Sequence, residues 1–211
     1  LCDNELSKES QICIALRILC GFSIEEIAKA FLSNKETINK RLYRAKKAIK
    51  ERNSVETNLT LNQYVARLDN VLRVIYLIFN EGYYSSVNED NIRHEIDWEA
   101  MRLSIFLSEH KIFPKQKIHA LIALMCFHTS RLDARISGER SDLLYHEQDK
   151  SKWNSALIQK GEKYLKLSAA GDIISKYHLE AAIAYWHTKD NNGKWNNILQ
   201  LYNKLLTIEY S

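Results

Sequence analysis

The feature that most restricts the fold of this chain is its shortage of residues that break helices. Among 211 residues there are only six Gly and one Pro, Pro114. These two residues fit worst inside a helix, and folds rich in strands and turns need them in number. Hydrophobic side chains make up 45% of the chain, which is ordinary for a globular protein with a real core. The sequence therefore predicts an all-α fold.

Apolar residues recur at helical spacing over most of the chain. Gly21 and Gly82 stand where helix ends are expected. The polar stretch 54–60 is expected to be a linker, which gives an N-terminal domain over 1–53 and a second domain over 61–211. The segment Ser137–Asp149 is expected to be a loop or a small hairpin. The helices are expected at about 12–20, 24–31, 38–49, 61–82, 96–107, 114–135, 150–167, 174–187 and 195–208.

Charge is distributed very unevenly. Residues 1–53 carry 11 basic and 7 acidic side chains, which accounts for the whole net charge of +4, whereas residues 54–211 carry 19 of each. The excess is densest in Lys35–Arg52, with eight basic and two acidic residues. Such a stretch is typical of a surface that meets nucleic acid or another acidic partner. The competing interpretation is a solvated helix face, the commoner cause of a charge run.

Two serine-led segments in tandem begin this region. Ser23-x-x-Glu26 and Ser33-x-x-Glu36 both fit the capping box, in which serine accepts from a backbone N–H of the first turn and glutamate accepts from the serine N–H. Two boxes ten residues apart predict two helices with a tight break between them. That arrangement is a helix-turn-helix.

The second of these helices has two unlike faces when its residues are placed at about 100° each. The stripe expected to be buried consists of Ile38, Leu42, Ala45 and Ile49. The opposite side carries Lys40, Tyr43, Arg44 and Lys47, with Thr37 and Arg41 on the flank. An apolar stripe opposite a basic outer face fits a helix that lies in the major groove of DNA.

The tandem helices resemble the promoter −35-reading domain, region four, of bacterial sigma factors of the sigma-70 family. They are most similar to the extracytoplasmic-function (ECF) group, through the stretches "ALRILCGFSIEEIAKAF" and "ETINKRLYRAKKAIK". The resemblance implies a winged-helix-like fold here. It also implies that bases are contacted by Asn39, Lys40, Tyr43 and Arg44, and phosphates by Lys35, Thr37, Arg41 and Lys47. Region two, which family members carry upstream, is missing, so a fragment of a longer protein is expected.

The second block resembles the helical C-terminal extension of one ECF subgroup, which contains tetratricopeptide (TPR) units. The matching stretches are "RVIYLIFNEGYYSS", "ALIALMCFHTSRLDAR", "EQDKSKWNSALIQKG" and "YHLEAAIAYWHT". The segment 176–209 has 34 residues and reads as helix, polar turn, helix, which is the length of one TPR unit. Its second helix carries Trp195, Leu199, Tyr202 and Leu206. The resemblance implies a regulatory or protein-interaction role.

Candidate site residues in this block are few. Asn80 and Glu81 could line a pocket, or could cap and pair locally where Gly82 ends a helix. Asp149 and Trp153 could form a contact surface, or could cap the next helix. The seven His residues show no metal-ligand spacing such as HxxxH, so no metal or other cofactor is expected.

The sequence thus predicts a sigma factor fragment that binds promoter DNA and core RNA polymerase, with a helical extension open to a regulatory protein. The alternative is a different helix-turn-helix regulator fused to a helical ligand- or protein-binding domain. An enzyme is not expected, although a deep pocket around Asn80, Glu81 and His128 would favour a helical enzyme or ligand sensor. Four Cys without a CxxC pair, no signal peptide and no apolar run of about 18 residues predict a cytoplasmic protein that does not enter a membrane.

Overall fold

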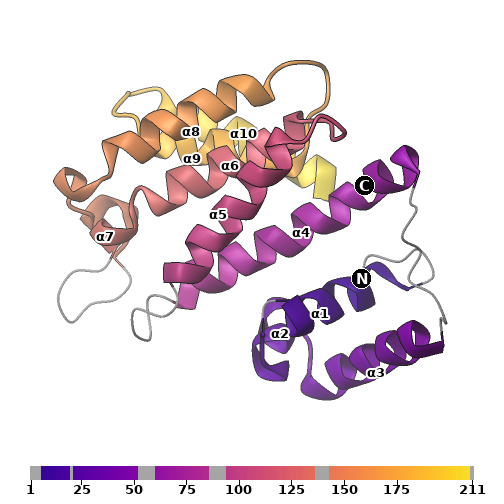
Figure 1. Ribbon diagram of the computed structural model, residues 1–211. Helices are drawn as coiled ribbons and strands as arrows, with labels where there is room; N and C mark the ends of the chain where they lie inside the picture. The colour runs from indigo at the N-terminus through magenta and orange to yellow at the C-terminus, as the bar shows by residue number, and fades with distance from the viewer. Residues whose placement is uncertain (1–5, 20, 52–59, 86–93, 136–142, 210–211) are drawn as a thin grey trace. The chain divides into compact units, whose positions relative to one another are not determined.

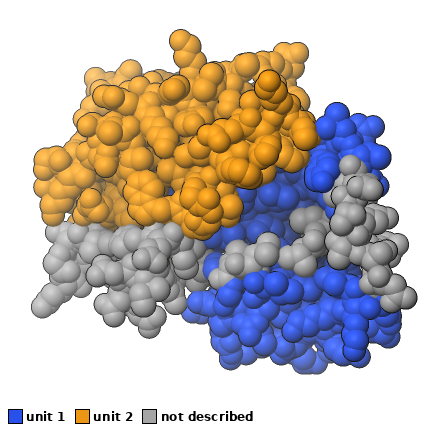
Figure 2. Space-filling view, in the orientation of Figure 1, with its two compact units in different colours: residues 1–81 blue, residues 82–211 orange. Residues whose placement is uncertain are grey.

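The computed structural model describes residues 6–19, 21–51, 60–85, 94–135 and 143–209 (Figure 1). Every regular element in these ranges is a helix, which confirms the all-α class, and they contain no strand that could form a wing. The chain divides into two compact units, residues 1–81 and 82–211 (Figure 2). The first unit therefore includes most of a helix that the sequence assigned to the second domain. The domain boundary at 54–60 stays a prediction, and its residues 54–59 lie outside the described ranges.

The first unit begins with three helices, α1 (Lys8–Leu19), α2 (Ile24–Ala30) and α3 (Lys35–Glu51). The helix α1 packs on both α2 and α3. The side chains at the centre of this packing are 0–5% exposed: Ile12, Leu16, Ile27, Ile38 and Leu42. Gly21 has φ +71°, which confirms the expected left-handed residue after α1.

The long helix α4 (Leu61–Ser85) starts with its own capping pair. The Thr60 backbone N–H donates to Gln63 Oε1 at 2.7 Å, and the Gln63 N–H donates to Thr60 Oγ1 at 3.4 Å. Within the first unit, Asn70 Nδ2 donates to Gln11 Oε1 at 2.8 Å and so ties α4 to α1. The expected face is buried, at Leu68, Leu72, Ile75 and Phe79.

The expectation that Gly82 ends this helix is wrong, because α4 continues to Ser85. Gly82 is needed for packing instead: a Cβ there would collide with Oδ1 of Asp97, which lies on α5. A glycine in a helix can mark a close approach of a neighbouring element rather than a helix end.

The second unit is built around the helix α6 (Gln116–Thr129), which packs on α5 (His94–Glu109), α8 (Ser155–Ser168) and α9 (Lys176–His187). The seven residues 121–127 of α6 are all buried, as expected of a helix enclosed on every side. The helix α8 comes close because Gly161 has no side chain: a Cβ there would lie 2.8 Å from Cε1 of Phe127.

The predicted helix 114–135 is wrong in two details. It starts at Gln116, after Lys115 rather than with Pro114, and it is broken after Thr129 before the short α7 (Leu132–Arg135). The break occurs because the Ser130 carbonyl accepts the Asn154 N–H at 2.8 Å and is thus bonded to a distant part of the chain.

The segment before α8 forms two 3₁₀ turns, Tyr145–Glu147 and Lys150–Lys152. The predicted helix 150–167 therefore begins later, at Ser155, where the Asn154 side chain caps it by accepting the Leu157 N–H at 3.1 Å. Of the predicted loop 137–149, residues 137–142 lie outside the described ranges.

The last two helices, α9 and α10 (Lys194–Glu209), pack on each other as a helical hairpin. The buried side of α9 includes Ala181 and Ala184, whose small side chains allow close approach. On α10, in contrast, the side chains of Trp195, Leu199, Tyr202 and Leu206 are 48–60% exposed. The hairpin has the length of a TPR unit, and its assignment as TPR-like stays a prediction.

Candidate nucleic-acid interface

The first predicted capping box forms at the start of α2. Ser23 Oγ accepts the Glu26 N–H at 3.1 Å, and Glu26 Oε2 accepts the Ser23 N–H at 2.6 Å. The two bonds satisfy backbone donors that the helix cannot use itself. They fix the point at which the chain enters the helix-turn-helix.

The second predicted capping box is wrong. The cap of α3 is Asn34, whose Oδ1 accepts the Thr37 N–H at 2.8 Å. Ser33 is still part of the preceding turn, where its N–H donates to the Ala28 carbonyl at 2.9 Å. Glu36 pairs with Lys40 at 2.7 Å. The turn is therefore one residue longer than the sequence pattern indicated.

The turn itself is closed by a left-handed residue without being a glycine. Leu32 has φ +46°, and its N–H donates to the Lys29 carbonyl at 3.0 Å. Together with the bond from Ser33 to Ala28, this is the Schellman arrangement that ends many helices. The Leu32 side chain is 98% exposed, so it does not contribute packing to offset the backbone strain.

The inner face of α3 holds it to the rest of the unit. Ile38, Leu42 and Ala45 are 0–5% exposed, which confirms three positions of the predicted stripe. The fourth position is wrong, since Ile49 is 37% exposed. The buried stripe ends early because α3 has 17 residues and the helix α1 on which it packs has 12.

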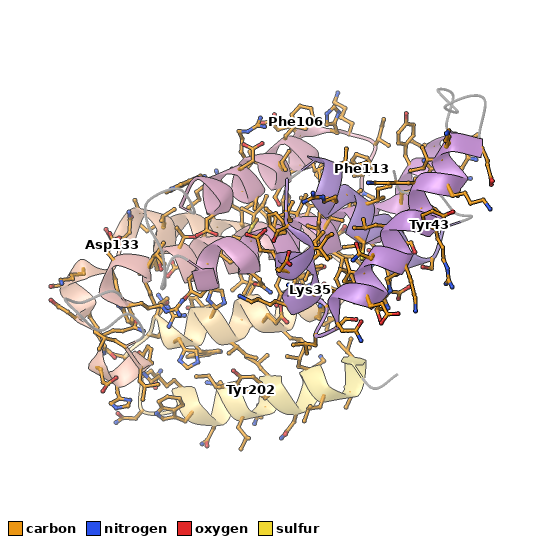
Figure 3. All side chains as sticks on the ribbon, turned by 90° about the horizontal axis from the view of Figure 1, so that it is seen from below. Lys35, Tyr43, Phe106, Phe113, Asp133 and Tyr202 are labelled. Atoms are coloured by element: carbon orange, nitrogen blue, oxygen red, sulfur yellow. The ribbon has the colours of Figure 1, made fainter. Side chains whose placement is uncertain are left out.

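The outer face of α3 carries most of the predicted DNA-binding residues. Six of the eight are exposed: Lys35, Asn39, Lys40, Tyr43, Arg44 and Lys47. Tyr43 is 70% exposed although its neighbour Leu42 is only 5% exposed. Lys35 and Tyr43 are labelled on this helix in Figure 3. Thr37 is half-buried in the first turn.

Surface carboxylates partly neutralise these cations. The ammonium groups of Lys35, Lys40 and Lys47 lie 2.5, 2.7 and 3.7 Å from Glu25, Glu36 and Glu51. The hydrogen bond from Lys35 holds the pKa of Glu25 below its usual value. All six side chains are at least half exposed, so water and salt weaken the pairs. A phosphate could therefore replace a carboxylate at little cost.

Two arginines of α3 are in different environments. Arg44 is exposed, and among the described residues its guanidinium has no partner. Arg41 is half-buried and faces the unit: its guanidinium carbon lies 5.5 Å from the centre of the Phe31 ring. Burial raises the pKa of the Cys13 thiol, and the charge and hydrogen bond of Arg41 partly oppose that rise. This placement gives Arg41 a packing role that the sequence pattern did not suggest.

Two exposed cations of α3, Lys46 and Lys50, were missing from the predicted set. They lie in its last two turns, beside the predicted Tyr43 and Lys47. The charge run itself would have indicated them, because every Lys of an exposed helix face adds to the same local field.

The four candidate residues outside the helix-turn-helix are divided between the units. Asn80, half-buried, and Glu81, whose side chain is outside the described set, belong to the first unit. Asp149 and Trp153 belong to the second. Asp149 Oδ1 accepts from the Ser151 N–H at 2.9 Å and from its hydroxyl at 2.7 Å, so Asp149 caps a 3₁₀ turn. Trp153 is half-buried, and its ring centre lies 5.8 Å from that of Tyr145.

Neither a metal site nor a membrane span is found in the described ranges. No group of three His, Cys, Asp or Glu side chains there is arranged to hold a metal ion. None of the helices in those ranges combines the length and the apolar character needed to cross a bilayer.

Comparison with known proteins gives two separate matches, one on each side of the predicted linker 54–60. Residues 2–49 match the model of sigma-70 region 4, and residues 67–169 match a family of unknown function (DUF6596). An uncharacterized protein of Rhizobium meliloti (strain 1021) is 29% identical over 216 residues. That match covers 100% of this chain and 51% of the relative, so the chain spans about half the length of the curated relative it matches. No solved structure matches. Residues 2–49 are therefore similar to sigma-70 region 4, and this similarity supports a sigma-factor-like DNA-binding role for this part of the chain.

Proposed function

We propose that this chain is part of a bacterial ECF-type sigma factor, in which α3 reads the −35 element of promoters for RNA polymerase. The observation that carries the proposal is the division of α3 into two faces. Ile38 and Leu42 are buried, while Lys40, Tyr43 and Arg44 are in water on the opposite side. A helix held in this way can enter the major groove without unfolding its own domain.

The outer face offers the contacts that such docking needs. Lys40, Arg44 and Lys47 follow one another at spacings of three or four, so one side of the helix presents three cations. Arg44 is the best candidate for a guanine edge, because its planar fork is not engaged elsewhere among the described residues. Lys35 and the first turn, with Thr37, are suited to phosphates, since the N-terminus of a helix attracts anions.

The second block then acts as an extension that docks a partner or controls the sigma domain. The support is its independent core around α6 and the match of 67–169 to a separate family. Its last hairpin, α9 and α10, is consistent with a TPR-like unit through its length of 34 residues. We propose no catalytic step for this chain. We propose that it acts in the cytoplasm.

A selection experiment tests DNA reading. The protein is incubated with a duplex library of random sequence, and bound DNA is sequenced. Wild type should enrich one motif, and Lys40→Ala/Arg44→Ala should lose that enrichment. The matched control is Lys163→Ala/Lys166→Ala, which removes two exposed charges from α8. If the control lost the enrichment equally, recognition of the motif by α3 would be refuted, because DNA binding would then depend on the total charge of the protein.

A second experiment distinguishes a sigma factor from another helix-turn-helix regulator. Tagged protein is used to capture RNA polymerase core from bacterial lysate, and the β and β′ subunits are quantified. The sigma proposal requires their enrichment over a tag-only sample. Motif selection without polymerase capture would favour the other class of regulator.

A further inference from the structure

A group of cations is buried at one end of the second unit. Arg131 and Arg135, at α7, and Lys194, at the start of α10, are only 7–8% exposed. Lys and Arg are almost never buried to this degree unless a partner holds the charge. Asp133, the acidic residue of α7, is exposed and is labelled in Figure 3. This group was not predicted from the sequence, although two arginines four apart after a long apolar run were a signal for it.

Arg131 is the member whose charge is not compensated. Its Nε is buried without a hydrogen-bond partner, and the guanidinium makes no ion pair with any described residue. Burial lowers the pKa of Arg131, and the groups that oppose this shift are the phenols of Tyr83 and Tyr145 rather than carboxylates. A buried cation in this state costs free energy that an anion would recover.

Aromatic and polar side chains lie around it. Tyr145 is central: its hydroxyl accepts from Lys194 Nζ at 3.0 Å, and its ring centre lies 5.0 Å from that of His187 and 5.8 Å from that of Trp153. The indole N–H of Trp153 and the hydroxyl of Thr129 are buried without partners. The backbone bond from Asn154 to Ser130 brings the Trp153 segment next to Arg131.

The neighbouring His187 is also kept from carrying a positive charge. Burial and the charges of Arg131 and Lys194 lower the pKa of His187 to about 4, so its ring is neutral at pH 7. Its Nδ1 is buried without a partner. A neutral imidazole can donate one further hydrogen bond when its tautomer allows. Lys194 has acceptors, since its Nζ donates to the Lys189 carbonyl at 3.2 Å and lies 3.9 Å from the Asp190 carboxylate. Arg131 Nε and the Trp153 indole N–H have none among the described residues, so these donors and the charge of Arg131 are left over.

We propose that Arg131, Lys194, Trp153 and His187 form a binding site, around Tyr145, for a small oxyanion, the carboxylate or phosphate group of a ligand. The planar fork of Arg131 can bind two oxygens of either group, and the neighbouring N–H donors can bind the remaining lone pairs. The site suits a small group rather than a DNA backbone, because its cations are 7–8% exposed whereas those of α3 stand in water. The inference does not depend on the sigma-factor role.

The test is thermal unfolding during titration with inorganic phosphate or acetate, at an ionic strength held constant with NaCl. Wild type should show a rise of a few degrees that saturates with one of the two ions, which identifies the preferred class. Arg131→Met should lose this response. Arg102→Met should keep it, because Arg102 is exposed on α5 of the same unit and pairs with Glu99, at 2.5 Å. Non-specific stabilisation by salt would act on all three proteins alike.

A second measurement keeps the proposal testable if Arg131→Met does not fold. The indole N–H signal of Trp153, assigned with Trp153→Phe, is followed by NMR in the wild type during the same titrations. A saturable shift of this signal, larger than those of Trp98 and Trp186, supports the site. If neither ion shifts it and neither raises the melting temperature of the wild type, or if Arg131→Met responds as the wild type does, the proposal is overturned.

Discussion

The helix α3 and the buried cations of the second unit, Arg131, Arg135 and Lys194, use the same residue types in opposite environments. On α3 the cations are in water and pair with surface carboxylates such as Glu36, at 2.7 Å from Lys40. In the second unit Arg131 is 8% exposed and lacks any such pair among the described residues. The comparison teaches that charge alone does not identify a ligand: exposed cations suit a long polyanion, and buried ones suit a small group that can enter.

The two sets of charged groups also differ in how strongly their surroundings change their energies and pKa values. The exposed pairs of α3 are weakened by salt and contribute little to folding. The buried groups of the second unit have displaced pKa values: that of His128 is lowered to about 3, mainly by burial, and that of Cys126 is raised to about 12 for the same reason. Changes to the first set should therefore alter binding, and changes to the second set should alter stability.

The largest effect is expected at the boundary between the two faces of α3. Leu42→Ala should lower the free energy of unfolding by about 2–5 kcal/mol, because it leaves a cavity under the helix. Tyr43→Ala, at the adjacent but exposed position, should change it by less than about 0.5 kcal/mol. Urea unfolding of both variants measures the contrast. Equal decreases would mean that α3 does not have one buried and one free face.

The next prediction concerns a buried acid in the second unit. Asp97 is 1% exposed, both of its carboxylate oxygens lack hydrogen-bond partners, and burial raises its pKa from 3.8 to about 7. Between about pH 4 and pH 7 the folded protein therefore still holds a proton that the unfolded chain has already lost. Stability should fall with rising pH in that window by about 1.4 kcal/mol per unit and level off above it.

Asp97→Asn isolates this contribution. The lowered pKa values of His128 and His187 act in the other direction, since the unfolded chain binds their protons up to about pH 6.5 and stability rises with pH there. The difference between wild type and variant removes the histidines. Denaturant unfolding from pH 4 to pH 8 should show a difference that grows in favour of the variant. A difference that is flat with pH would show that Asp97 is not a neutral buried acid.

A smaller effect is expected for the base-reading residue. Arg44→Ala should weaken binding to the selected DNA motif by about 1–3 kcal/mol if Arg44 pairs with a guanine, and unfolding should be unchanged. Fluorescence anisotropy with the motif and with a scrambled duplex separates two roles. Weaker binding to the motif alone indicates base reading, whereas the same weakening on both duplexes would show a phosphate contact.

The smallest effect is expected in the turn of the helix-turn-helix. Leu32→Gly should raise the free energy of unfolding by about 0.5–1 kcal/mol, because glycine relieves the left-handed strain but adds entropy to the unfolded chain. DNA affinity should stay the same. Leu32→Ala is the control, since it removes the side chain and keeps the strain. If alanine stabilises as much as glycine, the effect comes from the side chain.

Much of the first unit could be predicted because its signals are local. The Ser23 box, Gly21 and the spacing of Ile38 and Leu42 each depend on residues within a turn or two. The start of α3 was misplaced because Ser33 and Asn34 are adjacent and both can cap. The choice was made by the bond from Ser33 to Ala28, which depends on the shape of the turn.

The second unit was less predictable because its decisive contacts join distant residues. Gly82 looked like a helix end, and only the approach of Asp97 explains it. The break after Thr129 depends on Asn154, far along the chain. The buried cations come from the region of α7 and from the start of α10, so the local pair of Arg131 and Arg135 could be noticed in the sequence, but not its approach to Lys194, Tyr145 and Trp153.

The central claim is that the outer face of α3 binds DNA, and the salt dependence of affinity tests it most directly. The logarithm of the association constant is measured against the logarithm of the salt concentration for wild type, Lys35→Ala/Lys47→Ala and the α8 control Lys163→Ala/Lys166→Ala. Removing one cation that neutralises a phosphate should reduce the slope by about 0.9, so the slope should fall by nearly two for the α3 variant and stay the same for the control. An unchanged slope for the α3 variant, or the same reduction in the control, would contradict the account.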